Sequence, residues 1–260
     1  MKIAAAGDNC MDVYSDGSAF PGGNPVNVAV YTRRLGVPSS YTGAVGSDPY
    51  GLRILTALSE KGVDTSHVRI LEGATAVTRV CLEHGDRVLG DYDEGVLARF
   101  QLTQQDISFL AGHDLVVTGL WGKVERDLPA IRRGGARIAF DFADKLEAPI
   151  LDTALPCTDY AFFSCDSGDT PALRSRLKEF HARGPRLAVA TMGAQGSLAW
   201  DGTRFTACGI VPCPVVDTMG AGDSYIAGFL CGLLEGLPLD ACMRRGAESS
   251  AVTIGYFGAW

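Results

Sequence analysis

The sequence predicts an α/β fold in which helices cover both faces of a mainly parallel β-sheet. Short apolar runs alternate along the chain with helical patterns, and these runs are continuously apolar, as strands buried on both faces are. Alternating strands and helices build a parallel sheet through right-handed crossovers. The 260 residues, of which 47% are hydrophobic, suffice for one large domain, and the chain contains no apparent interdomain linker.

Short apolar runs supply the predicted strands of this sheet. The run at 2–6 opens the chain and is too short to be the apolar segment of a signal peptide, so it is the expected first strand. The runs that follow are separated by helical patterns, as parallel strands require. These further predicted strands are 41–45, 115–118, 137–142, 160–163 and 187–191.

The predicted helices end at recognisable stop signals. The first closes with Leu35-Gly36-Val37-Pro38, a glycine stop followed by proline, and the second closes with Lys61-Gly62. Two more helices follow the last strand and finish the chain. The predicted helices are 24–36, 49–61, 125–134, 171–183, 221–235 and 239–255.

Residues 74–94 depart from this alternation of strands and helices. Two arms rich in β-forming residues flank His84-Gly85-Asp86, which has the composition of a hairpin turn. An isolated hairpin is barely stable in water, so it is expected to pack on another part of the protein. The sequence therefore predicts a small lid over the edge of the sheet, or a contact between the two subunits of a homodimer.

Composition excludes several classes of function. A net charge of −7 argues against a basic nucleic-acid-binding face, and no apolar run approaches the ~18 residues of a membrane-spanning helix. The eight cysteines are scattered and form no Cys-x-x-Cys pair. They predict reduced thiols in a cytoplasmic protein, and neither a disulfide framework nor a zinc site.

The segment 217–223, Asp-Thr-Met-Gly-Ala-Gly-Asp, is the strongest chemical signal in the chain. It leads into a helix of small and apolar residues, so backbone N–H groups converge at a helix N-terminus, which suits a phosphate or a developing oxyanion. Asp223 is placed beside them to take a proton from an attacking hydroxyl, and the combination describes phosphoryl transfer to an alcohol. The alternative is a glycine loop in which Asp223 only starts the helix.

A second glycine-rich segment lies near the start of the chain. Gly22-Gly23-Asn24 and Asn27 combine close backbone approach with amide groups that can pair with hydroxyls, or they form a loop with a helix cap. Upstream, Asp8 and Asp12 lie just beyond the first predicted strand, at the edge of an open α/β sheet where ligands bind. A carboxylate there can accept two sugar hydroxyls, and the alternative is turn formation by Asp and Asn.

Taken together, these segments resemble the ribokinase-like, PfkB-type carbohydrate kinases. Gly22-Gly23-Asn24 with Asn27 matches the family's N-terminal signature, and 217–223 with Gly228-Phe229 matches its C-terminal signature. Motifs at 45–51, 61–64 and 191–197 follow in family order, so the resemblance spans about residues 2–260. It implies a single three-layer α/β/α kinase domain over 1–260 with a small β lid. It also implies ATP, Mg²⁺ and often a monovalent cation such as K⁺.

The resemblance assigns a role to each matching residue. Asp223 would be the base for the sugar hydroxyl, and loose phosphoryl transfer needs little more than alignment and charge neutralisation around it. The backbone N–H groups of the anion hole would be those of Gly220, Ala221 and Gly222. The implied sugar contacts are Asp12, Gly22, Gly23 and Asn27, and the implied nucleotide contacts are Thr191, Gly193, Gly196 and Thr218.

The sequence departs from the family pattern in two places. The usual Asn-x-x-Glu motif, which organises the metal and phosphates, is replaced by Ser164-Cys165-Asp166-Ser167, with Asp169 beyond it. Either carboxylate would bind Mg²⁺ through water, because this ion often keeps several waters, so the metal ligands are not assigned. The connection at 13–20 is short, which predicts a lid made mainly by 74–94 with one strand missing.

Six segments carry a closer likeness within this family, and they are 7–14, 22–31, 90–96, 121–122, 140–145 and 256–260. They resemble the fructoselysine kinases, which phosphorylate the O6 hydroxyl of a fructose unit linked through C1 to the lysine ε-amine. Asp91, Asp93 and Glu94 are then expected to face an ammonium-bearing tail, the alternative being a solvated strand edge. Tyr92 and Trp121 are candidates for stacking on the sugar, and core packing is the alternative for Trp121.

Two other functions fit the same residues. One is another ribokinase-like activity on a ketohexose, another glycated amine or a nucleoside. The other is a catalytically silent sugar-binding or regulatory protein, against which the intact Asp223 and glycine segment argue. For the sugar kinase, the expected partners are a small-molecule sugar substrate and ATP, with no nucleic acid and no membrane.

Overall fold

The computed structural model describes residues 1–83 and 86–260, and it confirms the predicted α/β fold. Nine strands form the main sheet in the order β13-β12-β11-β10-β9-β8-β1-β4-β5. The strands from β11 to β5 pair in parallel, and β12 and β13 add an antiparallel edge. Their bounds are β1 (Ile3–Ala6), β4 (Ser39–Gly46), β5 (Asp64–Leu71), β8 (Leu115–Gly119), β9 (Arg137–Asp141), β10 (Tyr160–Ser164), β11 (Leu187–Thr191), β12 (Ser197–Trp200) and β13 (Phe205–Cys208).

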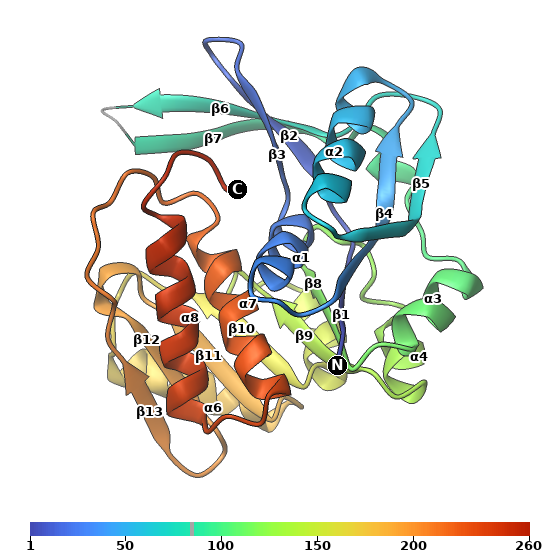
Figure 1. Cartoon of the computed structure of the whole chain (residues 1–260). Helices are drawn as coiled ribbons and strands as arrows, with labels where there is room; N and C mark the ends of the chain where they lie inside the picture. The colour runs from blue at the N-terminus through green and yellow to red at the C-terminus, as the bar shows by residue number, and fades with distance from the viewer. Residues whose placement is uncertain (84–85) are drawn as a thin grey trace.

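Helices cover both faces of this sheet, as Figure 1 shows. Alternate residues of β9 divide between the layers: Ala139 packs in the cluster with α1, α7 and α8, and Phe140 packs in the cluster with α3, α4 and α6. The helices are α1 (Asn24–Arg34), α2 (Pro49–Glu60), α3 (Gln104–Ala111), α4 (Leu128–Arg133), α5 (Ile150–Ala154), α6 (Pro171–Ala182), α7 (Ala221–Leu234) and α8 (Leu239–Thr253), with 3₁₀ turns η1 (Gly95–Arg99), η2 (Leu155–Cys157) and η3 (Gly193–Gln195).

The strands and helices that sequence reasoning missed lie mostly at the edges of the sheet. β5 is an edge strand with exposed and half-buried residues, so it lacks the continuous apolar run by which central strands are found. β12 and β13 form the opposite edge and are only four residues each. The helix α3 is short, and its start is marked by a capping box between Thr103 and Asp106.

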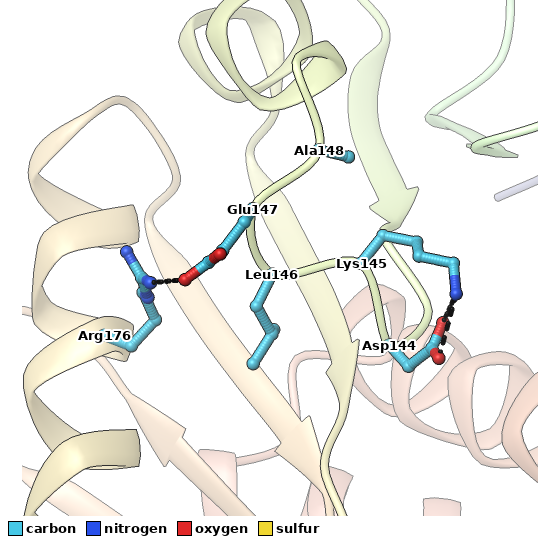
Figure 2. A pocket seen from close by; sticks show the side chains of 6 residues that line it. All are labelled: Asp144, Lys145, Leu146, Glu147, Ala148 and Arg176. Atoms are coloured by element: carbon cyan, nitrogen blue, oxygen red, sulfur yellow. Dashed lines mark hydrogen bonds and ion pairs between the residues drawn. The ribbon is translucent and has the colours of Figure 1, made fainter.

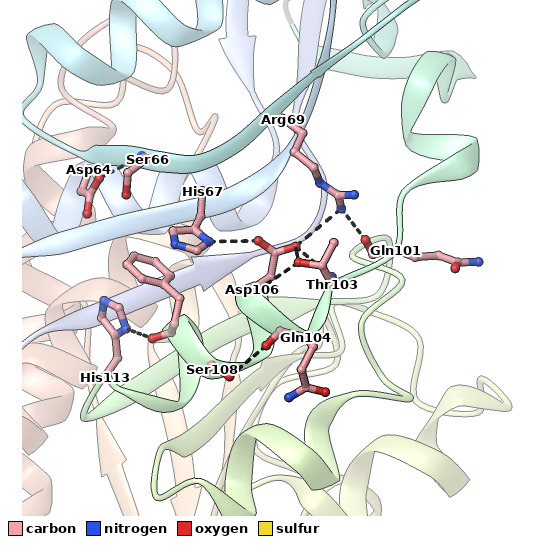
Figure 3. A network of polar contacts seen from close by, with 11 residues as sticks. Asp64, Ser66, His67, Arg69, Gln101, Thr103, Gln104, Asp106, Ser108 and His113 are labelled. Carbon is pink, nitrogen blue, oxygen red and sulfur yellow. Dashed lines mark hydrogen bonds and ion pairs between the residues drawn. The ribbon is translucent and has the colours of Figure 1, made fainter.

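Figure 3 shows how α3 holds β5 in place. Asp106 accepts a hydrogen bond from His67 of β5 at 3.0 Å and forms an ion pair with Arg69 at 3.7 Å, while its other contacts cap α3 at Thr103. Burial disfavours the charged carboxylate, but the hydrogen bonds from His67 and Thr103 outweigh burial and lower the pKa of Asp106. The His67 ring stacks on Phe109 at a centroid distance of 3.9 Å. This network is structural, since it fastens an edge strand.

A second sheet of four strands has the order β3-β2-β6-β7 and forms the lid. The sequence predicted only a short connection at 13–20, and this was wrong, because β2 (Cys10–Tyr14) and β3 (Ala19–Gly22) form a hairpin there. β2 also pairs in parallel with β6 (Val77–Glu83), which pairs with β7 (Asp86–Asp93). The first two residues of the predicted hairpin turn, 84–85, lie outside the described residues. Figure 1 places this sheet above the carboxyl ends of the parallel strands.

The order of the main sheet marks where a ligand is expected. From β1 the chain proceeds outward through β4 and β5, and it then returns to β8 on the other side of β1 and proceeds outward in the opposite direction. Open α/β sheets bind ligands outside the carboxyl ends of their strands at such a reversal. The lid covers this edge. Among the described residues, no helix is both long and apolar enough to cross a membrane.

Candidate active site

Two helices begin side by side at this edge of the sheet. Helix α1 begins at Asn24 after Gly23, whose φ is 107°, and α7 begins at Ala221 after Gly220, whose φ is 73°. Residues with a Cβ rarely adopt a positive φ, and a Cβ on Gly23 would lie 2.7 Å from Cα of Asn9. The two glycines therefore allow both chain segments to turn sharply into their helices. As a result, Asp223 in the first turn of α7 faces the start of α1.

The Asp223 carboxylate is held by two asparagines of α1. Its Oδ1 accepts a hydrogen bond from Nδ2 of Asn24 at 2.6 Å, and its Oδ2 accepts one from Nδ2 of Asn27 at 2.7 Å. Asn27 is oriented in turn by Trp260, whose indole N–H donates to Oδ1 of Asn27 at 2.7 Å. The chain end near Trp260 is fixed by the hydroxyl of Tyr31, which donates to the carbonyl of Ala259. The orientation of Asp223 is thus set by contacts from both ends of the chain.

Other carboxylates surround Asp223 and affect its protonation. Burial raises the pKa of Asp223 to about 6, the hydrogen bonds from Asn27 and Asn24 oppose this rise, and the charge of Asp12 adds to it. Burial is also the largest cause that raises the pKa values of Asp8 and Asp141 to about 7, and the charge of Asp223 contributes to both. A base with a pKa near 6 is ionised at neutral pH and still accepts a proton readily.

The sugar-side residues predicted from the sequence gather around Asp223 and the lid. Asp12 lies on β2, buried with 8% of its surface exposed, and the absence of a side chain on Gly22 leaves room for its carboxylate. Asp12 pairs with Thr78 and Thr78 pairs with Tyr92, so the three side chains lie on one face of the lid sheet. Burial, followed by the charge of Asp8, raises the pKa of the Tyr92 phenol. Tyr92 thus lies on the same face of the lid sheet as Asp12, with 38% of its surface exposed.

The predicted acidic residues at the end of the lid differ in their surroundings. Glu94 accepts a hydrogen bond from Nζ of Lys123 at 2.6 Å, and both side chains are partly exposed. Asp93 closes the turn by accepting from N–H of Gly95 at 2.9 Å, and Asp91 is exposed. Glu94 thus already has a cationic partner. Trp121 is 48% exposed, so core packing, the alternative for this residue, is wrong.

A cavity of ≈ 640 Å³ borders the first turn of α7 at Ala221 and Gly222 and has the size of a nucleotide site. All the predicted nucleotide contacts line it. Its walls also include apolar residues of the loop before α7, such as Ile210 and Val215, and Ala247 of α8. The predicted nucleotide contacts among its lining residues are Thr191, Gly193, Gly196 and Thr218.

The first turn of α7 borders this cavity with backbone N–H groups. The N–H of Ala221 donates to the carbonyl of Thr218 at 3.2 Å, so it is already used in the turn. The N–H groups of Gly222 and Asp223 belong to the first helical turn, which has no earlier helical carbonyls to bond. Gly222 lines the cavity, and a Cβ added there meets no protein atom within 4 Å, so it would extend into open space. Within this segment the glycine with a positive φ is Gly220, and Gly222 has an ordinary helical conformation.

The two candidate metal ligands lie in different environments. Asp166 lines the nucleotide cavity and is exposed. Asp169 instead pairs with Arg174 through two hydrogen bonds of 2.6 and 2.7 Å. Since Mg²⁺ is commonly held by one or two carboxylates together with phosphates and water, the exposed carboxylate of Asp166 fits this ion and the paired one of Asp169 does not.

A separate cavity of ≈ 480 Å³ follows the end of β9, as shown in Figure 2. Its charged residues pair with one another: Lys145 lies 2.9 Å from Asp144, and Arg176 of α6 lies 2.9 Å from Glu147. These pairs are exposed and contribute little to stability. None of the predicted sugar or nucleotide contacts lines this cavity.

Sequence reasoning missed three residues of the site. Asp141 ends β9 and accepts a hydrogen bond from Asn24 at 2.7 Å, Lys123 pairs with Glu94, and Trp260 orients Asn27. Only Asp141 carries a signal in the sequence, because it is an acidic residue at the carboxyl end of a continuous apolar run, where ligands of such sheets bind. The other two depend on contacts between distant segments.

Comparison with known proteins agrees with this geometry. The family model "pfkB family carbohydrate kinase" matches residues 11–260. The fructoselysine 6-kinase of Shigella flexneri is 46% identical over 259 residues, which are 99% of this chain and 99% of that protein. The fructosamine kinase FrlD of Bacillus subtilis is 37% identical, covering 100% of this chain and 93% of that protein. The structure of Arabidopsis thaliana ribokinase complexed with ribose and ATP superposes with a TM-score of 0.90 at 20% identity, over 99% of this chain and 93% of the ribokinase.

Proposed function

The chain belongs to the pfkB family of carbohydrate kinases, and we propose that it transfers the γ-phosphate of ATP to the O6 hydroxyl of fructoselysine or a close fructosamine. The observation that best supports this proposal is the position of Asp223. Its carboxylate faces the buried residues of the sugar side, while the same helical turn borders the nucleotide cavity. An acceptor hydroxyl and a phosphate would meet there, beside a base.

Asp223 acts as the general base in this proposal. As O6 attacks the γ-phosphorus, the O–H bond breaks, the proton passes to the Asp223 carboxylate, and the bond between the γ-phosphorus and the bridging oxygen of ADP breaks. The N–H groups of Gly222 and Asp223 hold the negative charge of the phosphates at the start of α7. Asp12 and Asn27 orient the sugar. Mg²⁺ bound beside Asp166 would neutralise phosphate charge.

The substrate assignment rests on relatives and on charge. The relatives with 37–46% identity over at least 99% of this chain are named as kinases of fructoselysine or fructosamines. Such substrates carry an amine that is cationic at neutral pH, and carboxylates dominate the sugar side of this site. The lid end carries Glu94 paired with Lys123. A lysine tail, which bears an ammonium and a carboxylate, offers a complementary charge to each member of that pair.

A coupled ADP-release assay tests this proposal. Fructoselysine, fructose, ribose and adenosine are offered separately with Mg-ATP, and a thermal shift is recorded with each compound. We expect turnover to be fastest with fructoselysine. Faster turnover of ribose or adenosine would indicate that the protein has another activity of the family. Binding of a sugar without ADP release would indicate a sugar-binding regulatory protein.

Three accompanying predictions concern a monovalent cation, the oligomeric state and the cellular location of the enzyme. A monovalent cation such as K⁺ is expected to raise turnover, as the family resemblance implies. The exposed edge of the lid sheet is the proposed surface for a homodimer. The scattered cysteines, of which Cys10, Cys231 and Cys242 are buried and free, fit a cytoplasmic location.

A further inference from the structure

The side chain of Asn24 bridges two carboxylates. Its Nδ2 donates to Oδ1 of Asp223 at 2.6 Å and to Oδ2 of Asp141 at 2.7 Å. An asparagine amide has two N–H bonds, and each is directed to one carboxylate. Asn24 therefore has no amide hydrogen left for a sugar hydroxyl while this bridge is formed. The sequence position of Asn24 suggests that it binds a sugar hydroxyl, but its amide hydrogens bind two carboxylates instead.

The orientation of the Asn24 amide is determined by these carboxylates. Its Oδ1 is buried and has no hydrogen-bond partner among the described residues, and it faces Gly119, where an added Cβ would lie only 2.9 Å away. Leaving a buried acceptor unpaired is unfavourable. Rotating the amide would lose both of these donated hydrogen bonds and would place Oδ1 against the ionised Asp223 carboxylate, which is worse because both atoms are acceptors. The amide is thus locked with both donors toward the carboxylates.

Asp141 is itself anchored to the central sheet. It is the last residue of β9, and its Oδ1 accepts from the N–H of Ala143 at 2.9 Å. Ala143 has a φ of 46°, a conformation that is uncommon outside glycine. Asp141 lies two residues beyond Ala139, so its side chain shares the sheet face that packs on α1 and α7. A continuous series of contacts leads from β9 through Asp141 and Asn24 to Asp223.

We propose that Asn24 and Asp141 are positioning residues that fix the rotamer of Asp223 and stabilise its negative charge before the acceptor hydroxyl arrives. This inference rests on the proposed role of Asp223 as the base. Among the described residues, the ionisable groups that interact electrostatically with Asp223 are Asp8 after β1, Asp12 on β2, Asp141 on β9 and Tyr31 on α1. Asn24 gives Asp223 a neutral donor within this mainly acidic set.

Replacing Asn24 with Ala tests the proposal through the pH dependence of kcat/KM for the sugar. A lost hydrogen bond to the charged carboxylate raises the pH of half-maximal kcat/KM by about one unit or more. We expect kcat to fall by about ten-fold or more while KM for the sugar changes little, because the bridge directs no donor to the sugar. The isosteric Asp141→Asn should lower kcat too, since an amide cannot accept hydrogen bonds from both Ala143 and Asn24 through its two terminal atoms.

Asn9→Ala is the matched control. Asn9 is also buried and uses Nδ2 in two hydrogen bonds, to Tyr41 at 2.8 Å and to the carbonyl of Ala44 at 2.7 Å, but neither acceptor is Asp223. It should lower the melting temperature without raising the half-maximal pH.

Two outcomes would overturn the proposal. One is a folded Asn24→Ala with an unchanged half-maximal pH and kcat. The other is an increase in KM alone, which would make Asn24 a sugar contact. If Asn24→Ala does not fold, unchanged kcat in Asp141→Asn overturns the proposal. Asp223→Asn, measured in parallel, distinguishes failure of the proposed base from failure of the positioning role. If Asp223→Asn retains turnover, the assignment of Asp223 as the base is wrong. If only the Asn24 and Asp141 variants retain turnover, the positioning role is wrong.

Discussion

Replacing Asp8 with Asn should make the stability of the protein less sensitive to pH. Asp8 follows β1, is 7% exposed, and has an Oδ1 with no hydrogen-bond partner among the described residues. Burial is the largest cause that raises its pKa to about 7, the charge of Asp223 adds to it, and hydrogen bonds from backbone N–H groups oppose it. An asparagine of the same shape removes the titration.

The sign follows from the difference between the folded and unfolded states. The unfolded chain releases the Asp8 proton near its ordinary pKa of 3.8, whereas the folded protein retains the proton up to about pH 7. The free energy of unfolding therefore falls through this window as pH rises, by about 1.4 kcal/mol per pH unit for this group. Between pH 5 and pH 8, Asp8→Asn should gain about 2–3 kcal/mol relative to the unchanged protein.

Urea denaturation at pH 5, 6, 7 and 8 measures this difference, with the two proteins compared at each pH. Asp16→Asn is the control, because Asp16 is exposed and hydrogen bonds from Ser18 lower its pKa, so it is ionised throughout this range. A stability difference between Asp8→Asn and the unchanged protein that stays constant from pH 5 to pH 8 would refute the reasoning. It would mean that folding does not retain a proton at Asp8.

Five further substitutions probe the chemistry. Asp223→Asn should lower turnover by about 10²–10⁴-fold while sugar affinity stays nearly intact, and near-normal turnover of the folded variant would remove Asp223 from the mechanism. Gly222→Val should fold, because its side chain would extend into the nucleotide cavity. It should impair turnover and ATP binding more than sugar binding. Binding assays that show weaker sugar binding and unchanged ATP binding would contradict the place of Gly222 at the nucleotide site. Glu94→Gln and Asp91→Asn should reduce the ratio of kcat/KM for fructoselysine to that for fructose, by about ten-fold for Glu94 if its charge contact is partly desolvated. Lys123→Met should also reduce that ratio. A ratio that is unchanged in all three variants, and also at high salt, would show that these residues do not contact the lysine tail.

Local patterns predicted the central fold well. Strands such as β9 and β11 are continuous apolar runs because helices cover both of their faces, and α1 and α2 end at glycine stops that the sequence displays. The edge strand β5 was not predicted because one of its sides faces solvent. The hairpin of β2 and β3 was missed because its pairing with β6 depends on a segment more than 60 residues away in the sequence.

The site was predictable only where a residue belongs to a local motif. Asp223, Gly220 and Gly222 lie in one glycine segment whose order implies an anion-binding helix start. The partners of Asp223 cannot be read in this way, because Asn24 meets Asp141 across 117 residues and Trp260 meets Asn27 across 233. These contacts form only when α1 packs over β9 and the end of the chain reaches α1.

The position of the transferred phosphate tests the central proposal most directly. The protein is incubated with fructoselysine and Mg-ATP, and the product is examined by mass spectrometry and phosphorus NMR, beside a parallel reaction with Asp223→Asn. The account predicts one phosphate monoester on the O6 hydroxyl and a strongly reduced yield in the variant. Phosphate on another hydroxyl, no phosphorylated sugar, or an equal yield from Asp223→Asn would contradict it.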